Sequence, residues 1–261
     1  MTSANVVGYY NNGLTQGKNK LSLIGGAMVD ITTGGVQLNN GVKVTGIKGA
    51  TGSAGADHLK LWDPTAVGGA GAYIEFYFYQ DGDPDNDGWC DPGTDDNIEK
   101  TPKYKNGFPA GTGFWYKAAD NAEKDITFSG AVEDAAYIEP PMSEGKQLTM
   151  FANAYPVMTQ FNPIGGKTMV SFSGLKGATG SAGADHIKMW DPAGASGAGK
   201  YIEFYFYQDG DPDNDGWCDP GTDDNIEKTA KYKNGLPVGT AFWFKPADAK
   251  TVRVIRFNKM F

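Results

Sequence analysis

Fourteen aspartates fall in two short stretches of this 261-residue chain, seven within residues 81–96 and seven within residues 209–224. In both stretches carboxylates recur at every second position and end on Gly, as in the DPDNDG run at residues 83–88. Carboxylates at the first, third and fifth positions of a tight turn can face one point, and the Gly that follows permits a sharp bend. The spacing therefore predicts a cation-binding loop in each stretch.

Calcium is the ion that this loop chemistry favours. Ca²⁺ takes about six to eight oxygen ligands, whereas Zn²⁺ prefers His or Cys. A backbone carbonyl at the seventh position and a carboxylate at the ninth extend the set of oxygens. The expected ligands are Asp83, Asp85, Asp87, the Trp89 carbonyl, Asp91 and Asp95 in the first loop, and Asp211, Asp213, Asp215, the Trp217 carbonyl, Asp219 and Asp223 in the second.

The twelfth loop position departs from the EF-hand pattern, because Thr94 stands where a bidentate Glu is usual. The missing carboxylate must then come from Asp95, Asp96 or elsewhere, and no helices are expected beside the loop. The loops resemble the short DxDxDG calcium loops of dockerins and of thrombospondin type 3 repeats, which implies calcium but not a shared fold. The alternative is an Asx turn with solvated carboxylates. Against it, seven carboxylates within sixteen residues repel one another unless a cation lies among them.

The acidity of the chain is a property of these loops. The net charge is −8, and without the fourteen loop aspartates it would be +6. No basic stripe is visible and the acidic loops repel phosphate, so a nucleic-acid partner is not expected. No apolar run approaches the ~18 residues that a membrane span requires.

No constellation of side chains predicts an enzyme. Asp57-His58 and Asp185-His186 are neighbours on expected strands, so the two side chains of each pair point to opposite faces and cannot form a dyad. Ser53 lies in a Gly-rich loop that has nothing of a nucleophile elbow.

The acidic loops belong to a tandem repeat. Residues 73–100 recur without a change as residues 201–228, at an offset of 128, and two flanking segments recur with few changes. Upstream of residue 49 the two copies diverge. We place the boundary where the ITFSG segment ends, which gives one module over residues 1–130 and a second over residues 131–261.

Each module is expected to be all-β. The chain has 37 Gly and 13% aromatic residues, and Asn-Gly pairs mark tight hairpin turns. Strands are expected over residues 58–62, 73–80, 112–117 and 125–128. Such short strands with turn signals between them favour two tandem β-sandwich or small-barrel modules.

The strand at residues 73–80 alternates between two kinds of side chain. Ile74, Phe76 and Phe78 lie on one face, and tyrosines lie on the other. If a second layer covers the tyrosine face, it is core. If it is exposed, it can stack on sugar rings or pack against another subunit.

Each copy contains one cysteine, Cys90 or Cys218, so a disulfide within one copy is impossible. The two can pair with each other only if the loops meet, and they can also cross-link neighbouring chains. A free thiol packed beside Trp89 or Trp217 is the third possibility.

The order of motifs in each copy resembles a known family. A W-D-P turn (residues 62–64 and 190–192) precedes a Tyr-rich strand and a P-x-G-x-x-F-W segment (residues 109–115 and 237–243). This order is similar to that of uncharacterised secreted β-repeat proteins of Gram-negative bacteria, whose leader ends just before a segment like ANVVGYY. The resemblance implies an extracellular or cell-surface location for a mature chain written without its leader, and it brings no established activity. Weak calcium sites fill at extracellular concentrations, which agrees with that location.

These features together predict a calcium-stabilised structural protein, a subunit of a surface layer, sheath or filament that self-associates into a homopolymer. The alternative is a calcium-dependent glycan-binding or adhesion module with a polysaccharide partner.

Overall fold

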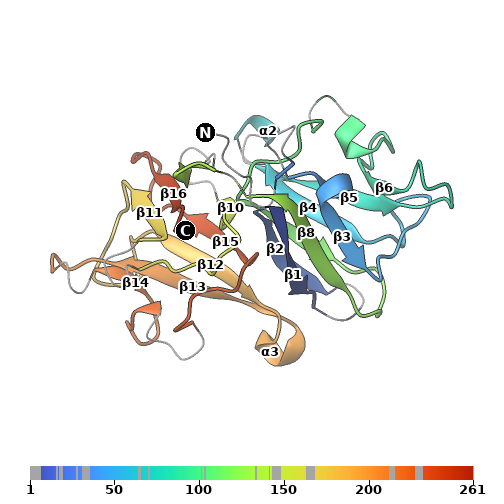
Figure 1. Ribbon diagram of the computed structural model, residues 1–261. Helices are drawn as coiled ribbons and strands as arrows, with labels where there is room; N and C mark the ends of the chain where they lie inside the picture. Colours follow the sequence, from blue (N-terminus) through green and yellow to red (C-terminus); the bar gives the residue numbers. More distant parts are fainter. Residues whose placement is uncertain are drawn as a thin grey trace.

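The computed structural model describes residues 7–15, 17, 20–27, 29–30, 36–63, 66–69, 71–100, 102, 104–132, 134–140, 142, 148–162, 168–211, 215–226 and 232–260. This part of the chain is all-β, as predicted, and its antiparallel sheets do not close into barrels (Figure 1). The expected strands over residues 58–62, 73–80, 112–117 and 125–128 are all present.

The largest element is a ten-stranded sheet that runs through both copies of the repeat. Its strand order is β14-β13-β12-β15-β10-β7-β4-β5-β6, and β2 also pairs with β7. The first copy contributes β2 (Leu21–Gly26), β4 (His58–Asp63), β5 (Ala72–Tyr79), β6 (Gly88–Cys90) and β7 (Thr112–Lys117). The second contributes β10 (Thr149–Ala152), β12 (His186–Asp191), β13 (Lys200–Tyr207), β14 (Gly216–Cys218) and β15 (Ala241–Lys245).

Backbone hydrogen bonds join the two copies at the centre of this sheet. Strand β10 pairs with β15 of its own copy and also with β7, where Phe151 lies opposite Thr112. In return, the Gly25 N–H of β2 donates to the Gly239 carbonyl at 2.7 Å. A Cβ on Gly25 would lie only 1.8 Å from the Ala152 Cβ, so the close approach of the two copies requires Gly here. The division into independent modules at residues 130 and 131 stays a prediction.

Each copy adds a three-stranded antiparallel sheet. The first has the order β1-β8-β3, from β1 (Val7–Gly13), β8 (Asp125–Ala131) and β3 (Val42–Thr45). The second has the order β11-β16-β9, from β11 (Val170–Ser173), β16 (Val254–Asn258) and β9 (Tyr137–Ile138). The two sheets are equivalent in register, because Val44 lies opposite Ile126 and Phe172 lies opposite Ile255.

Helical turns occur only as short connections among the described residues. They are α1 (Leu38–Gly41), α2 (Ala66–Gly69), α3 (Gly194–Gly197) and the 3₁₀ turn η1 (Ile98–Lys100). No helix of the described chain has the length and apolar character needed to cross a membrane.

Each small sheet packs on the inner face of its half of the large sheet. In the first copy, the buried Leu59, Phe76 and Phe114 of the large sheet share one core with Val44 and Phe128 of the small sheet. In the second copy, Phe172 of β11 stacks on Phe244 of β15 with ring centroids 5.6 Å apart. In this two-layered arrangement the acidic loops lie at the ends of the large sheet.

Candidate metal-binding loops and the adjoining cavity

The acidic loops lie at the two ends of the ten-stranded sheet. The first loop joins β5 to the terminal strand β6, and the second joins β13 to the opposite terminal strand β14 (Figure 1). Asp87 and Asp215 immediately precede these terminal strands. The repeat therefore places two identical sets of carboxylates far apart.

The upstream carboxylates of the first loop are held by N–H groups of the loop itself. Asp81 accepts hydrogen bonds from the Asp83 N–H at 2.8 Å and from the Asn86 side-chain amide at 3.3 Å. The same amide lies 3.5 Å from an Asp83 carboxylate oxygen, and the Asp81 N–H donates to Asp87 at 3.2 Å. The pKa of Asp81 is lowered, chiefly by the backbone N–H of Asp83. The Asn86 amide is thus a donor shared by two carboxylates.

The downstream carboxylates turn toward other partners. Asp91 accepts a hydrogen bond from the Gly93 N–H at 2.8 Å. Asp95 accepts one from the Tyr77 hydroxyl at 2.8 Å, and its φ of +57° is a left-handed conformation that Asp tolerates. In the second copy, the Tyr205 hydroxyl donates to Asp223 at the same distance. Each loop is therefore tied to a tyrosine of the large sheet.

The predicted carbonyl ligands are bound by asparagine side chains. The Asn39 amide donates to the Trp89 carbonyl at 3.3 Å, and its oxygen accepts the Trp89 N–H at 2.6 Å. Asn162 binds the backbone of Trp217 in the same way, at 3.3 and 2.8 Å.

The predicted carboxylates that the structure describes do not converge on one point. Among the described residues, no group of three or more His, Cys, Asp or Glu side chains is placed to hold a metal ion. Asp213 lies outside the described residues, whereas Asp211, Asp215 and Asp219 lie within them. Calcium binding stays a prediction.

The repeat at an offset of 128 does not predict Asn39 and Asn162 as functional residues. They lie 123 residues apart, not 128, because five more residues separate Asn162 from β11 than separate Asn39 from β3. The signal that marks them is the shared pattern V-Q-L-N at residues 36–39 and T-Q-F-N at residues 159–162. Val36 forms a β-bridge with Phe108, and Thr159 forms the corresponding β-bridge with Leu236. The two segments therefore occupy equivalent places in the two copies.

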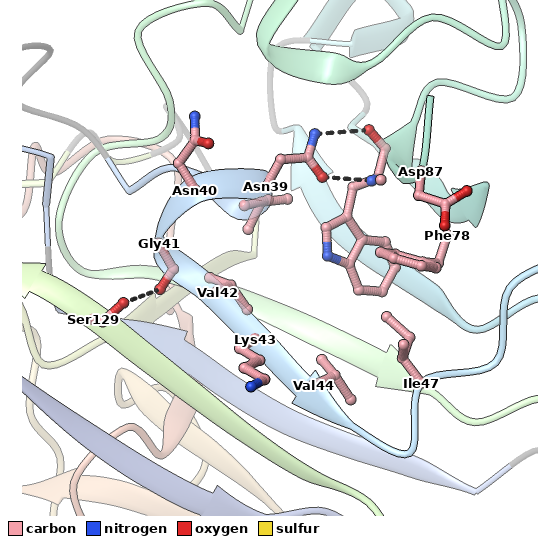
Figure 2. Close-up of a pocket in the computed structure, with 13 residues that line it drawn as sticks. Asn39, Asn40, Gly41, Val42, Lys43, Val44, Ile47, Phe78, Asp87 and Ser129 are labelled. Atoms are coloured by element: carbon pink, nitrogen blue, oxygen red, sulfur yellow. Dashed lines mark hydrogen bonds between the residues drawn. The ribbon is translucent and has the colours of Figure 1, made fainter. Parts of the chain in front are cut away.

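A cavity of about 520 Å³ adjoins the first acidic loop (Figure 2). It lies between the edge strand β3 of the small sheet and the terminal strand β6 of the large sheet, with α1 at one end. Val42, Val44 and Phe78 form apolar parts of the lining, and Asn39 and Asp87 form polar parts.

A buried ion pair anchors the Gly-rich loop of each copy. Asp57 is fully buried and lies 3.1 Å from the Lys124 ammonium group, 2.6 Å from the Tyr116 hydroxyl and 2.7 Å from the Ala119 N–H. Burial and the neighbouring Asp57 raise the pKa of Tyr116. His58 faces Glu75 instead, at 2.6 Å, as expected for a residue on the other side of the strand.

The second copy repeats this ion pair with different residues. Asp185 is fully buried and accepts a hydrogen bond from the Arg253 guanidinium at 2.7 Å. Burial acts to lower the pKa of Arg253, but the hydrogen bond and charge of Asp185 raise it above its ordinary value. The pair holds the Gly-rich loop against the ends of the strands. Because both side chains are buried, a substrate cannot reach them.

The tyrosine face of the large sheet is divided between core and surface. Tyr77 is fully buried beside Ala56 and Cys90, under the Gly-rich loop that precedes β4. Tyr73, in contrast, is 47% exposed, and its counterpart Tyr201 is 48% exposed. One strand therefore carries both a covered tyrosine, Tyr77, and an exposed tyrosine, Tyr73.

The exposed tyrosines belong to aromatic clusters that join the two copies. Trp62 and Tyr73 of the first copy contact Trp243 of the second, with ring centroids 5.8 and 6.4 Å apart. Trp190 and Tyr201 contact Trp115 in the reciprocal arrangement. Within the described chain the indole N–H groups of Trp62 and Trp190 are buried without a hydrogen-bond partner.

Both cysteines are buried, and neither forms a disulfide. Cys90 lies on β6 and Cys218 lies on β14, the opposite end strands of the sheet. A disulfide needs Cα atoms within about 7 Å, so the two cannot pair within one chain.

Comparison with protein-family models, with curated proteins and with solved structures finds no match to this chain.

Proposed function

We propose that this chain is a calcium-stabilised structural protein, a subunit of an extracellular surface layer, sheath or filament. The observation that carries the proposal is the continuous ten-stranded sheet with an identical acidic loop at each end. A sheet hydrogen-bonded across both copies resists bending between them, which suits a building block.

The chemistry of the loops supports calcium as the stabilising ion. Their donors are oxygens, from Asp side chains and from the Trp89 and Trp217 carbonyls, and hard oxygen donors suit Ca²⁺. Asp81 and Asp83 share the Asn86 amide as a donor, at 3.3 and 3.5 Å, and this contact supports a cation at that place. A cation supplies that positive charge more strongly than an amide does. Asp83, Asp85, Asp87, Asp91 and Asp95 are the first-loop carboxylates that we assign to it, with their counterparts in the second loop.

Self-association into a homopolymer would use the small sheets. In the part of the chain that the structure describes, β3 and β11 each pair on one side only, with β8 and β16. Such open edges can pair with a strand of another subunit. The terminal strands of the large sheet are covered at Trp89 and Trp217 by the asparagine amides, so growth through them is disfavoured.

Thermal melting and sedimentation of the full chain test both parts of the proposal. Millimolar calcium should raise the melting temperature relative to chelator, because an ion that binds only the folded state stabilises it by about 2.7 kcal/mol at a hundred times its Kd. A double variant, Asp85→Asn with Asp213→Asn, should lose most of that shift, and calcium should increase the sedimentation coefficient of the unmodified chain. The proposal is contradicted if chelator does not change the melting temperature and the chain sediments as a monomer under all conditions.

A glycan-binding module is the second candidate. It is favoured by Tyr73 and Tyr201, which are about half exposed. Exposed aromatic faces suit stacking on sugar rings. Absence of binding across a broad polysaccharide panel, with calcium present, removes this candidate.

A further inference from the structure

The contact between the two copies, which we call the seam, lies where β2 and β7 of the first copy meet β10 and β15 of the second. Two of the hydrogen bonds that cross the seam have the same length, 2.7 Å. In one, the Gly25 N–H donates to the Gly239 carbonyl, and in the other, the Ala152 N–H donates to the Gly111 carbonyl. The acceptors Gly111 and Gly239 are equivalent at the offset of 128.

The strand register shows that the donors of these two bonds are equivalent as well. Gly25 lies opposite Gly113 of β7, and Ala152 lies opposite Ala241 of β15. Gly113 and Ala241 are 128 residues apart, which is the offset of the repeat. Further contacts across the seam form reciprocal pairs, namely Ile24 with Thr240 and Phe151 with Thr112, and Trp62 with Trp243 and Trp190 with Trp115. Both copies thus use the same surface, as the two partners of a symmetric homodimer do.

One position makes the seam selective for unlike copies. A Cβ on Gly25 would lie 1.8 Å from the Ala152 Cβ, so these two equivalent positions face each other across the seam. Two second copies would therefore set one Ala152 against another, and their Cβ atoms would overlap. A first copy has no Cβ at this place and leaves room for the alanine. The surface of a second copy therefore fits a first copy and rejects another second copy.

We infer that the seam is also an interface between chains, in which the first copy of one chain pairs with the second copy of another in the same register. The partner is another molecule of this chain, because the surface is complementary to its own other half. Exchange of halves between two chains closes a dimer, and exchange along a row of chains gives an open polymer. The inference deepens the proposed self-association, but it rests on neither calcium nor the open edges of β3 and β11.

Pairing within one chain competes with this exchange. Only residues 132–136 lie between β8 and β9, so the chain holds its two halves close together, at an effective concentration on the order of mM. The closed single chain is therefore the expected form in dilute solution. Exchange is expected when chains fold beside one another at a concentration near that value.

Refolding of the full chain at two concentrations tests the exchange. The chain is unfolded in guanidinium chloride and refolded, with chelator present, at about 1 µM or at about 1 mM, on either side of the intrachain effective concentration. Sedimentation after dilution to one common concentration should show only monomer from the first sample. The second sample should contain dimers and longer species with the circular dichroism of the folded chain. Monomer alone in both samples contradicts the inference.

Two complementary variants identify the seam as the surface that exchanges. Gly25→Val blocks the first-copy side of the seam, and Ala152→Val blocks the second-copy side, so neither chain can close its own seam. In a mixture, the intact Gly25 of one chain can face the intact Ala152 of the other, and a 1:1 heterodimer should form. Gly52→Val is the matched control, because a Cβ on Gly52 meets nothing within 4 Å and this chain keeps its seam closed.

The heterodimer is detected with an affinity tag on the Ala152→Val chain. Untagged Gly25→Val should be retained with it, and untagged Gly52→Val should be lost in the wash. Equal retention of the two, or retention of neither when circular dichroism shows all three variants folded, contradicts the seam as an interface between chains. If the seam variants do not fold, the refolding of the unmodified chain decides. Because chelator is present throughout, a failure here leaves calcium stabilisation, which the melting experiment tests, unaffected.

Discussion

Asn39 and Trp89 form two hydrogen bonds that imitate one rung of a β-ladder. The Trp89 N–H donates to the Asn39 side-chain oxygen at 2.6 Å, and the Asn39 amide donates to the Trp89 carbonyl at 3.3 Å. A side chain therefore stands where the next strand would pair with β6. Because both partners recur in the second copy as Asn162 and Trp217, this cap is a feature of the repeat and not of one copy.

Replacing Asn39 by Ala should destabilise the chain by about 1 to 3 kcal/mol, because the buried Trp89 N–H would lose its partner. Chemical denaturation monitored by tryptophan fluorescence measures the change. The exposed neighbour provides the control, since Asn40→Ala should alter stability by less than about 0.5 kcal/mol. Equal effects of the two substitutions would show that the amide cap does not stabilise β6.

The glycine of the acidic loop has a steric role that the calcium pattern does not require. A Cβ on Gly88 would lie 2.8 Å from the Asn39 side-chain oxygen, and a Cβ on Gly216 would lie 2.7 Å from that of Asn162. Gly88→Ala should therefore displace the cap and cost about 1 to 3 kcal/mol of unfolding free energy.

Gly52→Ala is the matched control for this substitution. A Cβ on Gly52 meets nothing within 4 Å, so Ala should leave the folded state unstrained and stabilise the chain slightly, by about 0.4 to 1 kcal/mol. Denaturation midpoints of the two variants should move in opposite directions. A stable Gly88→Ala variant whose Asn39 amide signals are unchanged in NMR spectra would contradict the steric role.

The sequence predicts strands well where periodicity is local, and it predicts long-range partners poorly. Alternation at residues 73–80 identifies β5 and its two faces, but it cannot say what covers each face. Tyr77 is buried because the Gly-rich loop lies over it, whereas Tyr73, four residues away on the same face, is half exposed. That difference depends on a loop distant in sequence.

The capping asparagines show a second limit of sequence reasoning. Residues 73–100 recur at an offset of 128, whereas the segment that carries Asn39 and Asn162 follows an offset of 123. The same limit applies to the partners of the buried aspartates, because Lys124 and Arg253 lie 129 residues apart. Small insertions shift these equivalent residues of the two copies out of the common offset, and their equivalence becomes visible only in the fold.

Breaking the buried ion pair of the first copy should be strongly destabilising. Lys124→Met leaves the fully buried Asp57 without its cation, and breaking such a pair costs about 3 to 5 kcal/mol. Lys60→Met is the control, because Lys60 and Glu75 form a partly exposed pair at 3.1 Å that should contribute less than about 1 kcal/mol.

An NMR titration separates this electrostatic effect from lost packing. The hydrogen bond from Lys124 is the largest cause that lowers the pKa of Asp120. In Lys124→Met the pKa of Asp120 should rise toward its ordinary value, and in Lys60→Met it should stay where it is. An Asp120 pKa that is unchanged by the loss of Lys124 would contradict the shared ion pair.

Tyr10 and Tyr116 are two of the buried tyrosines that should make the chain sensitive to alkali. Burial raises the pKa of Tyr10 and of Tyr116 well above the ordinary value of 10.0. Below pH 10.0 both side chains are protonated in the folded and unfolded states, so their ionisation takes nothing from the free energy of unfolding. Above it the unfolded state ionises first, so the free energy of unfolding should fall by about 1.4 kcal/mol per pH unit for each tyrosine. Tyr116→Phe, which copies Phe244 of the second module, should remove one of these contributions and reduce the slope accordingly.

Absorbance at 295 nm across a pH series reports the same ionisation directly. Tyr10 and Tyr116 should ionise only when the circular dichroism of the folded state is lost, whereas exposed tyrosines ionise before that transition. The Tyr116→Phe chain should show one fewer ionisation coupled to unfolding, because Phe carries no hydroxyl. Ionisation of every tyrosine near pH 10.0, with the folded spectrum intact, would mean that neither hydroxyl is sequestered from water.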